Sequence, residues 1–147
     1  MKTIVKLSLS VLLLAAAAFA ETHPNLSGTW KLNTDKSDTS SSGVTALVAD
    51  VTHKDPALSY TVKGTAGGQD FEESESLTTD GKPSHDSQGN TVKAHWEGAT
   101  LVIEGTDYQG SAVYTAQLTL SDDGKTITRL FKQGHEPQSH RELYEKQ

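Results

Sequence analysis

Arg129 is the residue of this sequence with the clearest capacity for ligand binding. It stands between Ile127 and Phe131, and because residues two apart on a β-strand share one face, all three point the same way. A guanidinium among apolar side chains needs a counter-charge, which a Glu or Asp of the protein or an anionic ligand can supply. Aromatic residues on other segments add apolar surface. We therefore predict a ligand site built from Arg129, Tyr114, Phe131, Tyr60 and Trp96.

Carboxylates gather in the run DFEESE, residues 70–75. Alternation places Glu73 and Glu75 on the side of Phe71 and Leu77. Two carboxylates on one face can act as acid and base or bind a cation. We favour a plainer interpretation, in which this is a charged strand near the mouth of the fold that keeps the protein soluble.

Histidine, serine and cysteine patterns do not indicate catalysis or metal binding. Among six histidines, His135 and His140 flank Glu136, but such spacings match no established set of metal ligands. The chain has no cysteine, and no serine occupies a Gly-x-Ser-x-Gly turn, so the usual nucleophile patterns are missing. We expect no metal, no cofactor and no enzymatic activity.

The elements that position these residues are expected to be β-strands, because apolar and polar residues alternate with a period of two after residue 20. Turn sequences such as Asp80-Gly81 and Asp123-Gly124 imply that consecutive strands pair. A serial sheet with few bulky apolar residues avoids exposed edges by closing on itself. We predict an all-β fold, a single up-and-down antiparallel β-barrel of about 8–9 strands. The expected strands are 27–33, 44–53, 58–64, 69–79, 91–97, 100–108, 112–121, 126–133 and 139–146.

The first 20 residues are predicted to be a signal peptide. Lys2 and Lys6 give a positive start, residues 7–19 give an apolar run, and Ala18-Phe19-Ala20 gives a small-residue cleavage site. The apolar run has about 13 residues, fewer than the roughly 20 that a spanning helix needs, so we expect no membrane insertion. The prediction is an exported protein, periplasmic or secreted, with one barrel domain over residues 21–147.

The charge of the mature chain limits its partners. Without the two leader lysines, 11 Lys and Arg residues remain against 19 Asp and Glu, a net charge of about −8. Nucleic acids and anionic membrane surfaces are bound through basic patches. We therefore expect neither as a partner.

The two ends of the mature chain resemble a known superfamily. The segment LSGTWKLN, residues 26–33, resembles the Gly-x-Trp first strand of the calycins, which include lipocalins, fatty-acid-binding proteins and avidins. The closing RELYEKQ is similar to the last strand of fatty-acid-binding proteins, and SGTWKLN followed by KSD resembles secreted bacterial lipocalin-like proteins. The resemblance implies a lipocalin-like barrel.

Trp30 is expected to close the narrow end of that barrel. It shares the inward face of its strand with Gly28, whose missing side chain permits a close approach. In calycins an Arg or Lys of the final strand packs on the corresponding indole. The resemblance therefore implies a cation–π contact from Arg141, with Arg129 as the second candidate.

The carboxylate site of fatty-acid-binding proteins does not carry over. It needs Arg and Tyr two residues apart on the last strand, whereas Arg141 and Tyr144 are three apart and fall on opposite faces. Glu142, two before Tyr144, would repel a carboxylate. Residues 34–43 are too short and Ser-rich for lid helices, and the chain stops at its last strand, so neither a lid nor a C-terminal helix is expected.

Two functions remain open. The first is an exported, non-enzymatic barrel that binds a small, largely apolar molecule in its interior. The alternative is a protein-binding barrel, such as a periplasmic inhibitor of a secreted protease, that uses its loops or residues 21–25. An interior pocket larger than about 300 Å³ favours the first function, whereas a filled interior with projecting termini favours the second.

Overall fold

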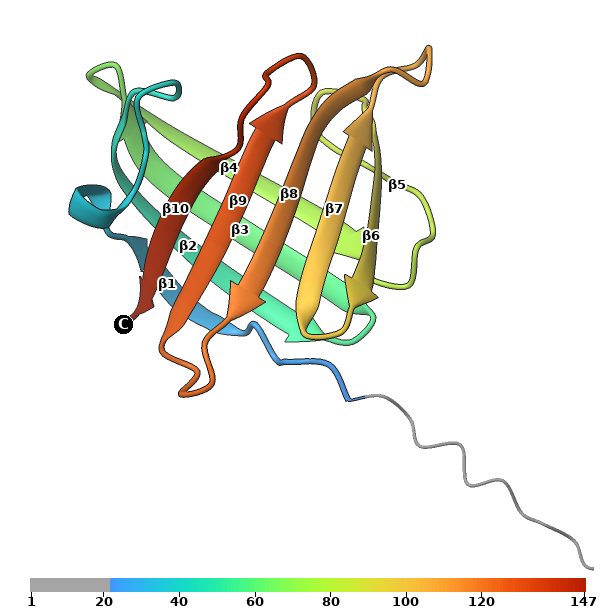
Figure 1. Ribbon diagram of the computed structural model, residues 1–147, viewed down its shortest axis with the longest axis horizontal. Coiled ribbons are helices and arrows are strands. Elements are labelled where there is room, and N and C mark those ends of the chain that lie inside the picture. Colours follow the sequence, from blue (N-terminus) through green and yellow to red (C-terminus); the bar gives the residue numbers. More distant parts are fainter. Residues whose placement is uncertain (1–21) are drawn as a thin grey trace, which may run out of the picture.

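Ten β-strands follow one another in the computed structural model, which describes residues 22–147 (Figure 1). The predicted signal peptide, residues 1–20, lies outside the described residues. The strands are β1 (Gly28–Leu32), β2 (Val44–Lys54), β3 (Ala57–Ala66), β4 (Gln69–Thr78), β5 (Ser84–His85), β6 (Thr91–Glu97), β7 (Thr100–Thr106), β8 (Ala112–Leu120), β9 (Thr126–Gln133) and β10 (His140–Lys146). A single 3-10 turn, η1 (Thr34–Lys36), follows β1.

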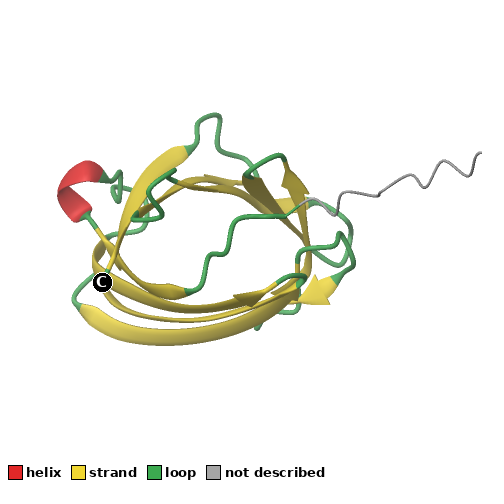
Figure 2. Ribbon diagram, turned by 90° about the horizontal axis from the view of Figure 1, so that it is seen from below, coloured by secondary structure: helices red, strands yellow, loops and turns green. Residues whose placement is uncertain are grey.

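The strands form one antiparallel sheet that curls into a nearly closed barrel. Its order is β4-β3-β2-β1-β10-β9-β8-β7-β6-β5, so strands consecutive in the chain pair except β4 with β5, and β1 pairs with β10. Figure 2 shows the strands surrounding a common interior. The sheet ends at β4 and β5, which share no strand pairing within the described residues. The side chain of Glu75 on β4 bridges this gap by accepting a hydrogen bond from the Ser87 amide at 2.9 Å.

The barrel class was predicted correctly, but the number of strands was not. The tenth strand is β5, whose two residues lie in the segment 81–90 and pair with β6. This segment has polar residues and no alternation long enough to indicate a strand. The prediction of no lid helices is matched by the described residues, in which η1 is the only helical turn between β1 and β2.

Leu26 and Trp30 form the floor of the barrel, meaning the layer of side chains that closes one end. Both are almost fully buried, and the Trp30 indole Nε1 donates a hydrogen bond to the Leu26 carbonyl at 2.9 Å. The Leu26 amide donates in turn to Nδ1 of the buried His53, at 3.2 Å. These bonds hold the segment before β1 across the end of the barrel, as Figure 2 shows.

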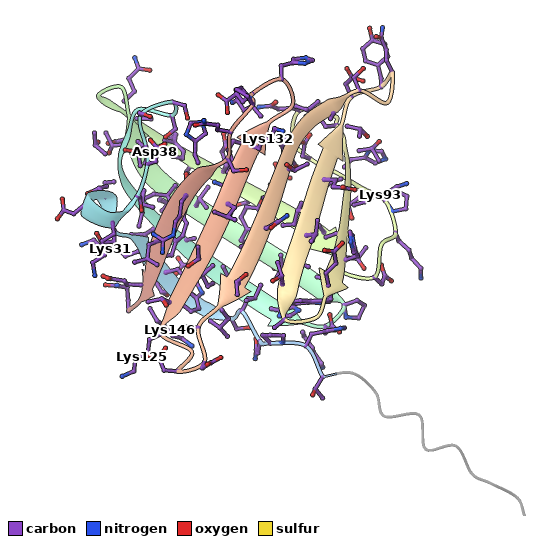
Figure 3. The ribbon with its side chains drawn as sticks, in the orientation of Figure 1. Lys31, Asp38, Lys93, Lys125, Lys132 and Lys146 are labelled. Atoms are coloured by element: carbon purple, nitrogen blue, oxygen red, sulfur yellow. The ribbon has the colours of Figure 1, made fainter. Side chains whose placement is uncertain are left out.

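The prediction that Arg141 covers Trp30 is wrong, because Lys146 takes that position. The Lys146 ammonium lies 5.3 Å from the centre of the Trp30 ring. Gly28 makes this possible, since a Cβ there would lie 2.8 Å from the Lys146 side chain, and its φ of +142° also favours glycine. Arg141 is exposed on the outward face of β10 and bonds to the Lys36 carbonyl. Figure 3 shows Lys146 at the floor end, beside Lys125.

The opposite end of the barrel carries a clasp, which we define as the contacts of His140 with Asp38 and Glu136. The imidazole Nδ1 lies 2.9 Å from a carboxylate oxygen of Asp38, and Nε2 lies 3.0 Å from one of Glu136. Asp38 belongs to the loop after η1, and Figure 3 labels it at the end remote from Lys146. The clasp therefore ties this loop to the connection between β9 and β10.

Candidate functional site: an interior cavity

A cavity of about 470 Å³ lies inside the barrel, above the floor, and is partly open to solvent. Four of the five residues predicted for a ligand site line it: Arg129, Tyr114, Phe131 and Tyr60. They come from β3, β8 and β9, which meet in the interior because residues two apart on each strand face inward. Most of the remaining wall is aliphatic. Its aliphatic residues are Leu26, Leu47, Ala49, Val51, Leu58, Val62, Ile103, Val113, Ala116, Leu118 and Ile127.

Arg129 is held inside the barrel by a carboxylate of the protein itself. Its Nη1 donates to Oε2 of Glu142 at 2.7 Å, and the Tyr144 hydroxyl donates to the same oxygen at 2.8 Å. Glu142 lies directly opposite Arg129 in the pairing of β9 with β10 and is buried. The sequence left two possible counter-charges for Arg129, a carboxylate of the protein or an anionic ligand. The structure supplies the first, from the neighbouring strand of the barrel wall.

Aromatic rings surround this charged pair. The Arg129 guanidinium lies 4.2 Å from the centre of the Phe131 ring, and the rings of Phe131 and Tyr114 stack with centres 6.1 Å apart. Burial raises the pKa of Tyr114 to about 12. Burial, with the neighbouring carboxylate of Glu142, also raises the pKa of Tyr144. Both hydroxyls therefore stay protonated at neutral pH and can donate hydrogen bonds.

Three carboxylates also line the cavity, on the side where β4 and β5 fail to pair. Glu73 and Glu75 point inward from β4, and Asp86 follows β5. Asp86 caps its own turn by accepting from the amides of Gln88 and Asn90. Tyr60 lies directly opposite Glu75 in the pairing of β3 with β4, and burial, with the nearby charge of Glu75, raises the pKa of its phenol.

Trp96 does not line the cavity, contrary to the sequence-based prediction. It faces inward on β6, but it lies at the end of that strand beyond the floor. Its ring stacks on His23 with centres 4.9 Å apart, and its Nε1 lies 3.4 Å from a carboxylate oxygen of Asp55. Hydrogen bonds from Thr79 and His23 hold the pKa of Asp55 at about 2. Trp96 thus secures the segment before β1, not a ligand.

The sequence analysis missed Leu26 as part of the floor, and it did not identify Glu142 as the partner of Arg129. Leu26 lies four residues before Trp30, so alternation continued backwards would have placed it on the same face. Glu142 shares a face with Tyr144 for the same reason, but only the strand pairing shows that it meets Arg129. A register irregularity at Gly105 also changes one wall, because Val113 lines the cavity while Ala112 is exposed.

The arrangement can bind and orient an amphiphilic molecule. The aliphatic wall accepts apolar groups, and the charged pair, phenols and carboxylates mark where a polar group can lie. Within residues 22–147, no three His, Cys, Asp or Glu side chains lie together in a way that could hold a metal ion. No helix in that range is long and apolar enough to span a membrane.

Comparison with known proteins supports the fold. No protein-family model matches the chain, and no curated protein matches its sequence. A solved structure, secretory abundant heat soluble protein 4 from Ramazzottius varieornatus, matches with a TM-score of 0.57. The match has 12% sequence identity and covers 84% of this chain and 95% of that chain. At this identity the likeness shows a shared lipocalin-like barrel fold and nothing about ligands.

Proposed function

We propose that the protein is an exported, non-enzymatic barrel that binds one small, largely apolar molecule in its interior. The observation that carries the proposal is the cavity of about 470 Å³, which exceeds the roughly 300 Å³ at which drug-sized ligands begin to fit. Its wall is mostly aliphatic and aromatic, with a few polar groups at defined positions. Such a composition is typical of sites for small apolar ligands.

The alternative is a protein-binding barrel, such as a protease inhibitor, that uses its loops or its N-terminal segment; the use of the N-terminal segment receives less support. Residues 22–27 pack across the end of the barrel, with His23 bonded to Asp55 and Leu26 buried. The C-terminal strand pairs on both sides. Neither terminal segment therefore projects from the barrel in the way that an inhibitor using its termini would require.

Fluorescence of the neutral dye Nile red tests the proposal. We expect saturable binding of one dye per chain with increased emission, because the dye enters an apolar cavity. Ala116→Phe, which places a ring into the cavity, should weaken binding at least about tenfold. Gln117→Phe is the matched control, because Gln117 is exposed on the next position of β8.

Equal binding by wild type, Ala116→Phe and Gln117→Phe would overturn the proposal, as would an absence of saturable binding to wild type. Far-UV circular dichroism and thermal melts of each variant separate a filled cavity from a failure to fold.

A further inference from the structure

The cavity has a single basic side chain, and that charge is already compensated. Arg129 is the only Lys, Arg or His among the cavity-lining residues of the described chain, and it is bound by Glu142 at 2.7 Å. The Glu142 side chain is only 10% exposed and is also bonded to Tyr144. An entering carboxylate would have to displace a buried carboxylate from its partner and then leave it without a counter-charge. Such an uncompensated buried charge is strongly unfavourable.

The remaining charges of the wall are negative. Glu73, Glu75 and Asp86 all line the cavity, and no lysine does so. Lys31 and Lys93 point away from the barrel in Figure 3. The interior potential near β4 and β5 is therefore negative, which repels anions and attracts cations.

Aromatic rings accompany the carboxylates at this position. Tyr60 and Tyr114 line both the main cavity and a small adjoining pocket, together with Glu75 and Asp86. The faces of aromatic rings attract cations within about 6 Å, and they do so more strongly where water is excluded. Carboxylates and phenol rings on one wall are thus complementary to an ammonium group.

Glu73 is the carboxylate best able to contact a ligand. Glu75 already bridges to the Ser87 amide, and Asp86 caps its own turn. Glu73, in contrast, has no hydrogen-bond or ion-pair partner within the described residues; it lines the cavity, and its side chain is also exposed to solvent. Its charge is free to pair with an entering cation.

We infer that the ligand is an amphiphile with a cationic, ammonium-type head and an apolar tail. The head lies against Glu73 and the phenol of Tyr60, and the tail extends toward the floor formed by Leu26 and Trp30. This inference rests on the proposed function, because it assigns a ligand class to the same cavity. Glu142 acts as the specificity-determining residue that keeps Arg129 from binding acids.

Displacement of Nile red by three ligands with the same ten-carbon chain tests the head group. Decyltrimethylammonium should displace the dye best, decanol less well, and decanoate least, with about tenfold or more between the ammonium and the carboxylate. Measurements at low and high salt, below the critical micelle concentrations, should show the difference shrinking as salt rises. Decanol or decanoate binding as well as the ammonium overturns the inference and leaves the proposed function standing. Displacement by none of the three overturns the inference, whereas the proposed function is overturned only by the Nile red results given above.

Substitutions on β4 test whether the preference for the ammonium ligand arises from the inward face of this strand. Glu73→Gln should weaken displacement by decyltrimethylammonium about fivefold or more and leave decanol unchanged. Glu72→Gln is the matched control, because it removes the same charge from the outward face of β4. Glu72 pairs there with Lys63 at 3.6 Å. Equal effects of the two variants contradict the assigned contact.

Glu142→Gln tests the specificity-determining role from the opposite direction. Without the carboxylate, the Arg129 guanidinium becomes available, and decanoate binding should rise about tenfold or more while decanol binding stays the same. Unchanged decanoate binding by the folded variant overturns the role of Glu142. The Glu73 and Glu72 variants lie on an exposed part of β4, so they keep the head-group inference testable even if Glu142→Gln does not fold.

Discussion

At the scale of single residues, the charged pair of Arg129 and Glu142 shows how the residue type at one position can change the chemistry of a cavity. Glu142 and Tyr144 are two apart on the last strand and share the inward face, where an Arg and a Tyr would together make a carboxylate site. With a glutamate at the first position, the two hydrogen bonds to its Oε2 are satisfied within the protein. The charge of Arg129 is thereby compensated by a carboxylate of the protein itself.

Trp30 gives a prediction at the same scale. Trp30→Ala removes the largest fully buried side chain of the described barrel and the hydrogen bond to the Leu26 carbonyl. The free energy of unfolding should fall by about 3–5 kcal/mol, as for other buried Trp→Ala changes. The melting temperature should fall by roughly 10 °C or more. Thermal and urea denaturation of the two proteins measure both quantities.

Lys146→Met is the matched control for the indole, because it removes the cation above the ring and keeps an aliphatic chain. It should cost only about 0.5–1 kcal/mol. If Trp30→Ala melts within a few degrees of wild type, the floor assignment is wrong.

At the scale of elements, the clasp between the loop after η1 and the β9–β10 connection should depend on pH. Hydrogen bonding to Asp38, and then to Glu136, raises the pKa of His140 above its ordinary value. Bonds from Ser40 and His140 lower the pKa of Asp38 to about 2. The His140 contribution is complete below about pH 6.5 and is lost as the pH rises through the raised folded pKa. The Asp38 contribution is complete above about pH 3.8 and is lost as the pH falls toward 2.

The clasp is therefore strongest between about pH 4 and 6.5. We expect the difference in melting temperature between wild type and His140→Gln to be larger at pH 6 than at pH 8.5. His135→Gln, an exposed histidine of the same connection, serves as control and should show no such trend. A wild-type advantage that stays constant from pH 6 to 8.5 would show that His140 is not protonated in the clasp.

Alternation predicted most strands and the inward faces of β3 and β9, because a period of two is a local property of the sequence. It could not predict what depends on pairing between strands. The register irregularity at Gly105 turns Ala112 outward, and the meeting of Glu142 with Arg129 requires the β9–β10 register. Lys146 contacts Trp30 because the β1–β10 register places the two residues directly opposite each other, whereas Arg141 lies on the outward face of β10. Trp96 likewise faces inward but lies beyond the floor.

At the scale of the whole molecule, the protein is a barrel closed at one end by Leu26 and Trp30, with a cavity above that floor. Small side chains leave this space, and a ligand inside it would make the contacts that packed side chains make elsewhere. A chain of this size could fill its interior with larger residues at positions such as Ala116 and Ala49, yet it does not. The retained space is consistent with a ligand that completes the packing.

Intermolecular nuclear Overhauser effects with decanol test the central claim, that an apolar ligand occupies the interior, most directly. Decanol is uncharged, so the outcome does not depend on the head-group inference. The account predicts contacts from the alkyl chain to the methyl groups of Ile103, Leu118 and Ile127, which line the cavity. Contacts confined to the outward-facing, exposed Leu130, or no contacts at saturating decanol, would contradict it.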